Sequence, residues 1–316
     1  MTGFLARRLL SVVIVLAIMS LIIYGLIGLM PGDPIDLMIT ADPHLTPQDA
    51  ERLKALYGLD RPLLERYAQW GRNALLGDFG YSRLYGAPAF AVLETRLVNT
   101  LLLMGTSFVL ALALALPLGL LGARRPGSLP DWITNVTGLG GISLPPFWLA
   151  LMLILLFAVH LKWLPPAGLA TIGGGLGDRA LHLILPVMTL TLGSLGTYVR
   201  FMRAAVIEVM AQDYIRTARA KGAGPWRVLV HHALRNALLP VITIVALSFG
   251  ALFSGALVTE TMFAYPGMGK VIYDAVLGND FNLALAGLMV ATLVTLLSNL
   301  AADIAYAMAD PRITYR

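Results

Sequence analysis

Residues 213–240 read DYIRTARAKGAGPWRVLVHHALRNALLP, the longest polar and basic interruption in the C-terminal half of an otherwise apolar chain. Apolar segments long enough to cross a bilayer lie on both sides of it, at roughly residues 182–207 and 237–259. A membrane protein places that many charges on a short connector when the connector touches something soluble. We therefore interpret this stretch as the contact between a membrane-embedded chain and a soluble partner.

The composition of the whole chain indicates a membrane protein. Of the 316 residues, 58% are hydrophobic and 13% are charged, whereas soluble domains carry about 25% charged residues. The sequence predicts an all-α, polytopic membrane protein with six transmembrane helices, because six apolar segments match a hydrocarbon layer of about 30 Å. A bend is expected in the third segment at Pro145-Pro146, and a second in the fourth near Pro186 or Gly193. The six segments cover roughly residues 9–30, 99–122, 133–159, 182–207, 237–259 and 283–307.

The N-terminus has two interpretations. Arg7 and Arg8 precede an apolar run from residue 9 to 29, as in a signal peptide. That run is longer than the 7–15 apolar residues usual in signal peptides, and Met30-Pro-Gly-Asp-Pro34 follows it in place of a small-residue cleavage site. We expect a retained transmembrane helix at residues 1–30.

The remainder divides into two further parts. Residues 31–98 are predicted to form an extracytoplasmic helical segment without a catalytic role, since residues 46–56 and 61–70 have amphipathic patterns. Residues 99–316 would form a core of five membrane helices that carries a cytoplasmic loop at residues 208–236.

Positive charges fix the expected orientation. With six spans, most Lys and Arg near the span ends fall on one side, and an odd number of spans would break this pattern. The positive-inside rule then places both termini in the cytoplasm. The basic residues on that side are Arg7, Arg8, Arg124, Arg125, Arg216, Arg219, Lys221, Arg227, Arg235, Arg312 and Arg316.

Several kinds of chemistry have no support in the sequence. Residues 266–271 contain a Gly-Met-Gly-Lys run, but no hydroxyl residue follows the lysine as a phosphate-binding loop requires. His231 and His232 are adjacent and would face different directions on a helix, which favours a basic loop over a metal site. The chain has no cysteine, and no basic patch with interleaved aromatic residues indicates a nucleic-acid partner.

The 213–236 stretch has the pattern of two short helices. Asp213 is expected to cap a helix over residues 214–221, and Gly222 or Gly224 to end it in a left-handed turn. Pro225 suits the first turn of a second helix that continues to Asn236 and the next span. The alternative is a topological anchor of positive charge alone, which explains the arginines but not the glycine-bounded, alanine-rich pattern.

This loop resembles the signature of ABC-importer permeases, in which Glu-Ala-Ala is followed by a glycine and then by Leu-Pro. Here Arg216-Thr217-Ala218 occupies the Glu-Ala-Ala position, Gly222 is the glycine and Leu239-Pro240 closes the motif. The missing glutamate and the longer distance to Pro240 are both typical of the dipeptide and oligopeptide branch. Further motifs resemble the B-type subunit of that branch, at residues 30–34, 57–62, 77–82, 143–147, 164–168, 259–263, 266–269, 279–280 and 309–312.

The resemblance implies the type I ABC importer permease fold, in the bacterial inner membrane, with neither catalytic activity nor a cofactor in this chain. It implies a heterodimer with a second, C-type permease, two ABC ATPase subunits that bind ATP and Mg²⁺, and an extracytoplasmic peptide-binding protein. The matched motif assigns the ATPase-coupling helix to Tyr214, Ile215, Arg216, Thr217, Ala218, Arg219, Ala220 and Lys221, with Gly222 as its turn.

Three acidic residues near the membrane are further candidates for gating or ion pairing. Glu260 lies at the outer end of the fifth span, Asp280 lies just before the sixth, and Asp303 lies inside the sixth. A secondary carrier would need more carboxylates within its spans, and an intramembrane enzyme would need a nucleophile with a base or a metal. The sequence leaves open whether the substrate is a dipeptide, a longer peptide, a nickel chelate, glutathione or another small solute.

Overall fold

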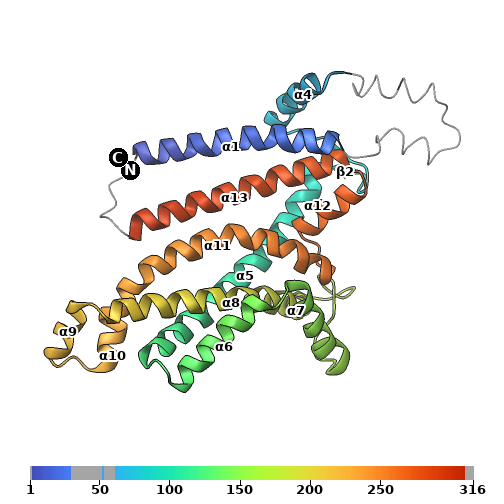
Figure 1. Cartoon of the computed structure of the whole chain (residues 1–316). Coiled ribbons are helices and arrows are strands. Elements are labelled where there is room, and N and C mark those ends of the chain that lie inside the picture. Colours follow the sequence, from blue (N-terminus) through green and yellow to red (C-terminus); the bar gives the residue numbers. More distant parts are fainter. Residues whose placement is uncertain (1, 30–51, 53–60, 310–316) are drawn as a thin grey trace. The chain divides into compact units, whose positions relative to one another are not determined.

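The structure is a computed structural model, and it describes residues 2–29, 52 and 61–309. The first amphipathic helix expected at residues 46–56 therefore falls outside the described residues. Almost all described elements are helices (Figure 1). They are α1 (Thr2–Gly28), α4 (Leu63–Leu75), α5 (Ala89–Arg124), α6 (Leu129–Ser143), α7 (Pro146–Leu153), the π-helix η1 (Ile154–His160), α8 (Leu176–Met210), α9 (Asp213–Ala220), α10 (Pro225–Arg227), the π-helix η2 (Val228–Ala233), α11 (Leu234–Met262), α12 (Met268–Leu277) and α13 (Phe281–Ala309).

Each of the six predicted spans coincides with helix. Within the described residues, α1, α5, α8 and α13 are long and apolar enough to cross a membrane, and the bent pair of α6 with α7 and η1 makes a fifth if it counts as one span. α11 covers the fifth predicted span, although many of its side chains lie outside what the structure describes. The all-α, polytopic prediction is confirmed, whereas the count of six stays a prediction.

The third predicted span is not one straight helix. The chain leaves helical geometry at Leu144 and Pro145, and the segments on either side differ in direction by 106°. Two successive prolines explain the break, because a proline disfavours helix in the residue before it and removes one helical donor. The fourth span, where a bend was expected, contains no break in the helix. α8 runs without interruption through Pro186 and Gly193.

The chain divides into two compact units, and each is described by itself. The first comprises Met1–Asn99 with Gly267–Val294. In it, α4 packs on α1: the hydroxyls of Ser20 and Tyr67 are 2.7 Å apart, and Tyr24 contacts the rings of Tyr67 and Trp70. α4 confirms the amphipathic helix expected at residues 61–70.

The first unit also contains two elements that the sequence did not predict. A short antiparallel hairpin pairs β1 (Tyr81–Ser82) with β2 (Ala87–Pro88). The amphipathic helix α12 lies between α11 and α13 in the chain, and its apolar face is buried. Both elements are short, and contacts with distant parts of the chain stabilise them.

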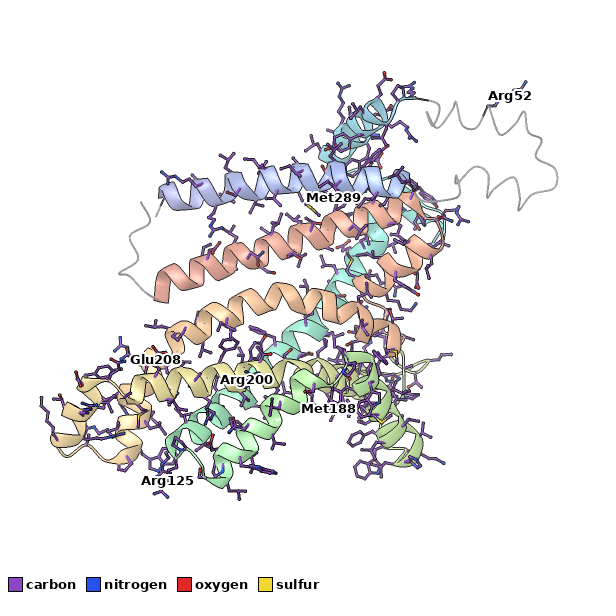
Figure 2. All side chains as sticks on the ribbon, in the orientation of Figure 1. Arg52, Arg125, Met188, Arg200, Glu208 and Met289 are labelled. Carbon is purple, nitrogen blue, oxygen red and sulfur yellow. The ribbon has the colours of Figure 1, made fainter. Side chains whose placement is uncertain are left out.

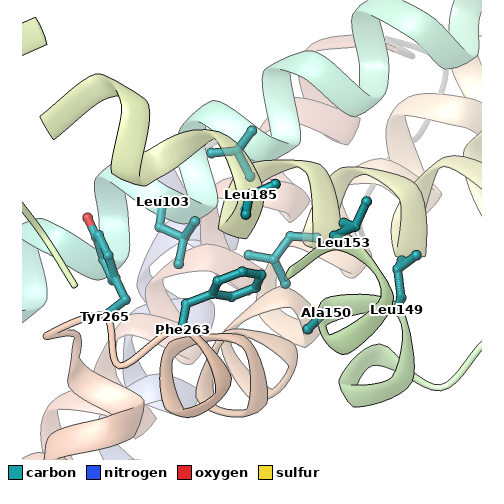
Figure 3. Close-up of a cluster of buried hydrophobic side chains, with 9 residues drawn as sticks. Leu103, Leu149, Ala150, Leu153, Leu185, Phe263 and Tyr265 are labelled. Atoms are coloured by element: carbon teal, nitrogen blue, oxygen red, sulfur yellow. The ribbon is translucent and has the colours of Figure 1, made fainter. Parts of the chain in front are cut away.

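The second unit comprises Thr100–Pro266 with Thr295–Arg316. One of its apolar cores is formed by α5, α7, α8 and the end of α11, and Figure 3 shows its side chains. Phe263 and Tyr265 belong to this core, and each is 1% exposed. This core fixes the C-terminal end of α11 against α7 and α8.

α6 and α8 contact each other through glycines. A Cβ added at Gly196 of α8 would lie 2.5 Å from the carbonyl oxygen of Gly138, and one added at Gly141 of α6 would lie 2.8 Å from that of Leu192. The two main chains therefore touch, as they do in membrane helix pairs that use small residues at the interface.

Candidate functional site

α9, the predicted coupling helix, is held in place by the burial of one of its faces. Ile215 is fully buried and Ala218 is nearly so, and both belong to an apolar cluster with Val228 and Ala233 of η2. Partly buried side chains at the end of α8 pack against the same cluster. The protein itself thus covers one side of α9, through two of the nine residues assigned to coupling.

The outer face of α9 carries the other coupling candidates. Tyr214, Arg216, Thr217, Arg219, Ala220 and Lys221 are all exposed. Arg216 approaches Asp213 at 3.3 Å, but the two side chains are 76% and 93% exposed, so the pair contributes at most about 1 kcal/mol. The hydroxyl of Tyr214 accepts a hydrogen bond of 2.8 Å from Asn236, which ties α9 to the start of α11. α9 therefore presents a polar, cationic surface on a helix that is fixed from behind.

Gly222 ends α9 as predicted. Its φ is +85°, in the left-handed region that glycine adopts without strain. The amide of Gly222 donates to the carbonyl of Arg219 at 2.9 Å, and that of Ala223 donates to the carbonyl of Ala218 at 3.1 Å. These are the two hydrogen bonds of a Schellman motif, which satisfies carbonyls that a helix end leaves free.

The start of α9 differs from the prediction by one residue. Gln212, and not Asp213, occupies the N-cap position, with no side-chain capping bond. Asp213 lies in the first turn, where its negative charge still favours the positive end of the helix dipole.

The second helix follows the prediction, with one addition. Pro225 occupies the first turn of α10, and helical structure continues through η2 into α11. The π-helical geometry of Val228–Ala233 was not predicted. Such insertions in a helix recur at functional sites.

Glu260 is fully buried near the C-terminal end of α11. Its carboxylate accepts a hydrogen bond from the hydroxyl of Thr100. Burial, together with the charge of Glu260, raises the pKa of Tyr265 in the following loop to about 12. A buried carboxylate in this position suits the predicted pairing or gating role, which stays a prediction.

Asp280 caps α13 and fixes the β1–β2 hairpin. One carboxylate oxygen accepts hydrogen bonds from the Ser82 hydroxyl at 2.6 Å and from the Leu84 amide at 2.9 Å. The other accepts from the Leu283 amide at 3.3 Å. Within the described residues these partners are hydrogen-bond donors and not cations, so the structure gives Asp280 an architectural task, and its gating role stays a prediction. Asp303 is partly buried in α13, and its role is likewise a prediction.

The sequence reasoning missed an ion pair between α6 and α8. Asp131 Oδ1 lies 2.5 Å from Arg203 Nε, and the side chains are 7% and 24% exposed. The carboxylate of Asp131 also accepts a hydrogen bond of 2.8 Å from the Gly127 amide. The available signal was Arg203 inside an apolar segment, because a charge there requires a partner.

The described residues contain no group of three His, Asp or Glu side chains placed to hold a metal ion.

Comparison with known proteins identifies the chain. Residues 115–315 match the family described as binding-protein-dependent transport system inner membrane component, and residues 1–104 match the N-terminal model of such components. The chain belongs to this family. The permease is 39% identical to the oligopeptide transport system permease protein AppB of Bacillus subtilis strain 168, over the full length of both chains. It is 35% identical to the glutathione transport system permease protein GsiC of Escherichia coli K12, again over both full lengths.

A solved structure supports the fold of the permease. A chain of the MetNI methionine ABC transporter, in inward-facing conformations, superimposes with a TM-score of 0.56 at 20% identity, covering 69% of the permease and 96% of that chain. The permease is thus a multi-pass inner membrane protein with an ABC importer permease fold.

Proposed function

We propose that the permease forms, together with a second permease of the C type, the translocation path of an ATP-driven importer of dipeptides or oligopeptides. α9 carries the proposal. Its inner face is buried through Ile215 and Ala218, and its outer face, with Arg216 and Arg219, is exposed. A helix so divided is fixed to its own protein and free to bind a soluble ATPase subunit.

Two ATPase subunits would bind ATP and Mg²⁺ and hydrolyse the nucleotide, while the permease contributes no catalytic residue. α9 follows directly on α8 and is tied to the start of α11 by Tyr214 and Asn236. Nucleotide-dependent movement of the ATPase would therefore act on both membrane helices. Import requires that nucleotide and a loaded binding protein favour different states of the same inward–outward equilibrium.

The substrate class rests on the named relatives. AppB is named for oligopeptide transport, and GsiC is named for glutathione, itself a short peptide. Peptides are the substrate class that both names share, and glutathione is the second candidate. The positive-inside rule supports cytoplasmic termini and hence a cytoplasmic position for α9.

The test is reconstitution of the permease with candidate ATPase subunits, a second permease and a peptide-binding protein. We expect ATP hydrolysis and uptake to increase with binding protein loaded with di- to pentapeptides. Competition by glutathione against peptide separates the two substrate candidates. Uptake driven by an ion gradient without ATP would contradict the proposal and favour a secondary carrier.

A further inference from the structure

A small cavity lies beside α9, in the corner where the α5–α6 connection meets the end of α8 and the start of α10. Its volume is about 260 Å³, just below the range of about 300–1,000 Å³ typical of drug-sized ligand sites. The cavity suits a small chemical group. It is lined by Arg124, Arg125, Met210, Arg219, Ala223, Pro225, Val228 and Leu229.

The lining combines positive charge with an apolar floor. Three of the lining residues are arginines. Within the described part of the chain, no lining residue is acidic. Arg124 is fixed, because its guanidinium stacks over the Trp226 ring with 4.6 Å from its central carbon to the ring centre. Val228 and Leu229 are buried beneath the cavity. Such a site attracts an anion whose remainder is apolar.

The depth of the cavity along the helices matches the lipid headgroup layer. Arg124 and Arg125 follow the predicted end of the second span by two and three residues, and Met210 follows the predicted end of the fourth by three. At 1.5 Å per residue this distance is about 3–5 Å. The headgroup region occupies about 5–7 Å on each side of the hydrocarbon core. Figure 2 shows Arg125 at this end of the second unit.

We propose that this cavity binds the phosphate headgroup of an anionic phospholipid, with Arg124, Arg125 and Arg219 around the phosphate and the apolar floor against the glycerol and the start of the acyl chains. Basic pockets between membrane helices on the cytoplasmic side are known lipid-headgroup sites. The proposal goes beyond peptide import and uses only the expected orientation of the chain. Since Arg219 belongs to α9, a bound lipid would also contact the helix assigned to coupling.

The test is lipid retention by the full-length permease, purified in detergent and incubated with equal amounts of phosphatidylglycerol and phosphatidylcholine. Native mass spectrometry counts the lipids that remain bound. The variant is Arg125→Gln, because this side chain is exposed and its replacement is not expected to disturb folding. The matched control is Arg227→Gln, which removes one exposed arginine from the same end of the unit but does not line the cavity.

We expect wild type to retain phosphatidylglycerol in preference to phosphatidylcholine, and Arg125→Gln to lower that retention about fivefold, the effect of one basic residue at an anionic membrane surface. Arg227→Gln should retain the lipid like wild type. Equal losses in both variants would reduce the effect to general surface charge and overturn the site. Unchanged lipid retention in Arg125→Gln would also overturn the proposed lipid site, and would favour an acidic protein partner as the ligand of these arginines. Binding of inorganic phosphate by wild type without retention of phosphatidylglycerol would refute the assignment to a lipid.

Discussion

Replacement of Gly222 is the sharpest test of the coupling assignment. A Cβ added at this position would meet no atom within 4 Å, so a substitution causes no steric clash. The whole free-energy cost of a substitution therefore comes from the backbone φ of +85°, because left-handed geometry costs a residue with a Cβ roughly 1–2 kcal/mol. A β-branched residue such as valine is expected to lose more.

That penalty acts on the end of α9. To relieve the strain, a variant gives up the hydrogen bonds of Gly222 and Ala223 to α9, each with a net contribution of about 0.5–1.5 kcal/mol. A change of 1–2 kcal/mol shifts the equilibrium between the correct and a misplaced α9 by roughly 5- to 30-fold. The membrane helices, which are stabilised elsewhere, should insert normally.

Gly224 provides the matched control. An added Cβ there also meets nothing within 4 Å, but its φ is −64°, which any residue adopts. In the reconstituted complex we expect substrate-stimulated ATP hydrolysis to fall in the order wild type, Gly222→Asn, Gly222→Ala, Gly222→Val, because asparagine tolerates the left-handed region best among the replacements. Gly224→Ala should match wild type. If Gly222→Val transports peptide like Gly224→Ala, α9 does not couple ATP hydrolysis to transport.

Four further outcomes are expected. Ile215→Ala should loosen α9 and lower the melting temperature, since truncating a fully buried isoleucine destabilises a protein by about 2–5 kcal/mol. Arg216→Glu should leave the melting temperature unchanged and weaken ATPase binding in a salt-dependent way. Equal melting curves for the two variants would contradict the assignment of Ile215 to the buried face and Arg216 to the exposed face. Asp131→Asn should lower the melting temperature, because it leaves the charge of Arg203 without its anionic partner; an unchanged melting temperature would exclude this role. A reporter fused after Arg316 should read as cytoplasmic, and an extracytoplasmic signal would refute the proposed topology.

The parts that sequence reasoning recovered depend on local chemistry. Gly222 and Pro225 have backbone preferences that act over a few residues, so the helix, its turn and the second helix could all be read from the loop. The break at Pro145 was visible for the same reason. Its angle was not, because packing against other helices sets it.

The parts that were missed depend on contacts between distant residues. Asp280 fixes a hairpin nearly two hundred positions earlier in the chain, and no spacing pattern links it to Ser82. The pair of Asp131 and Arg203 likewise joins separate helices. The apolar face of α12 is buried only through its place in the folded unit. The three arginines of the cavity come from the end of α5, the connection that follows it and α9, which lie far apart in the sequence.

The glycine contact between α6 and α8 has a mechanical consequence. Where side chains separate two helices, a change of rotamer allows one helix to slide a little against the other. Gly196 lies directly against the main chain of Gly138, and Gly141 lies against that of Leu192. Because main chains yield far less than side chains do, a displacement of α8 is expected to carry α6 with it, so that the two helices move as one rigid unit.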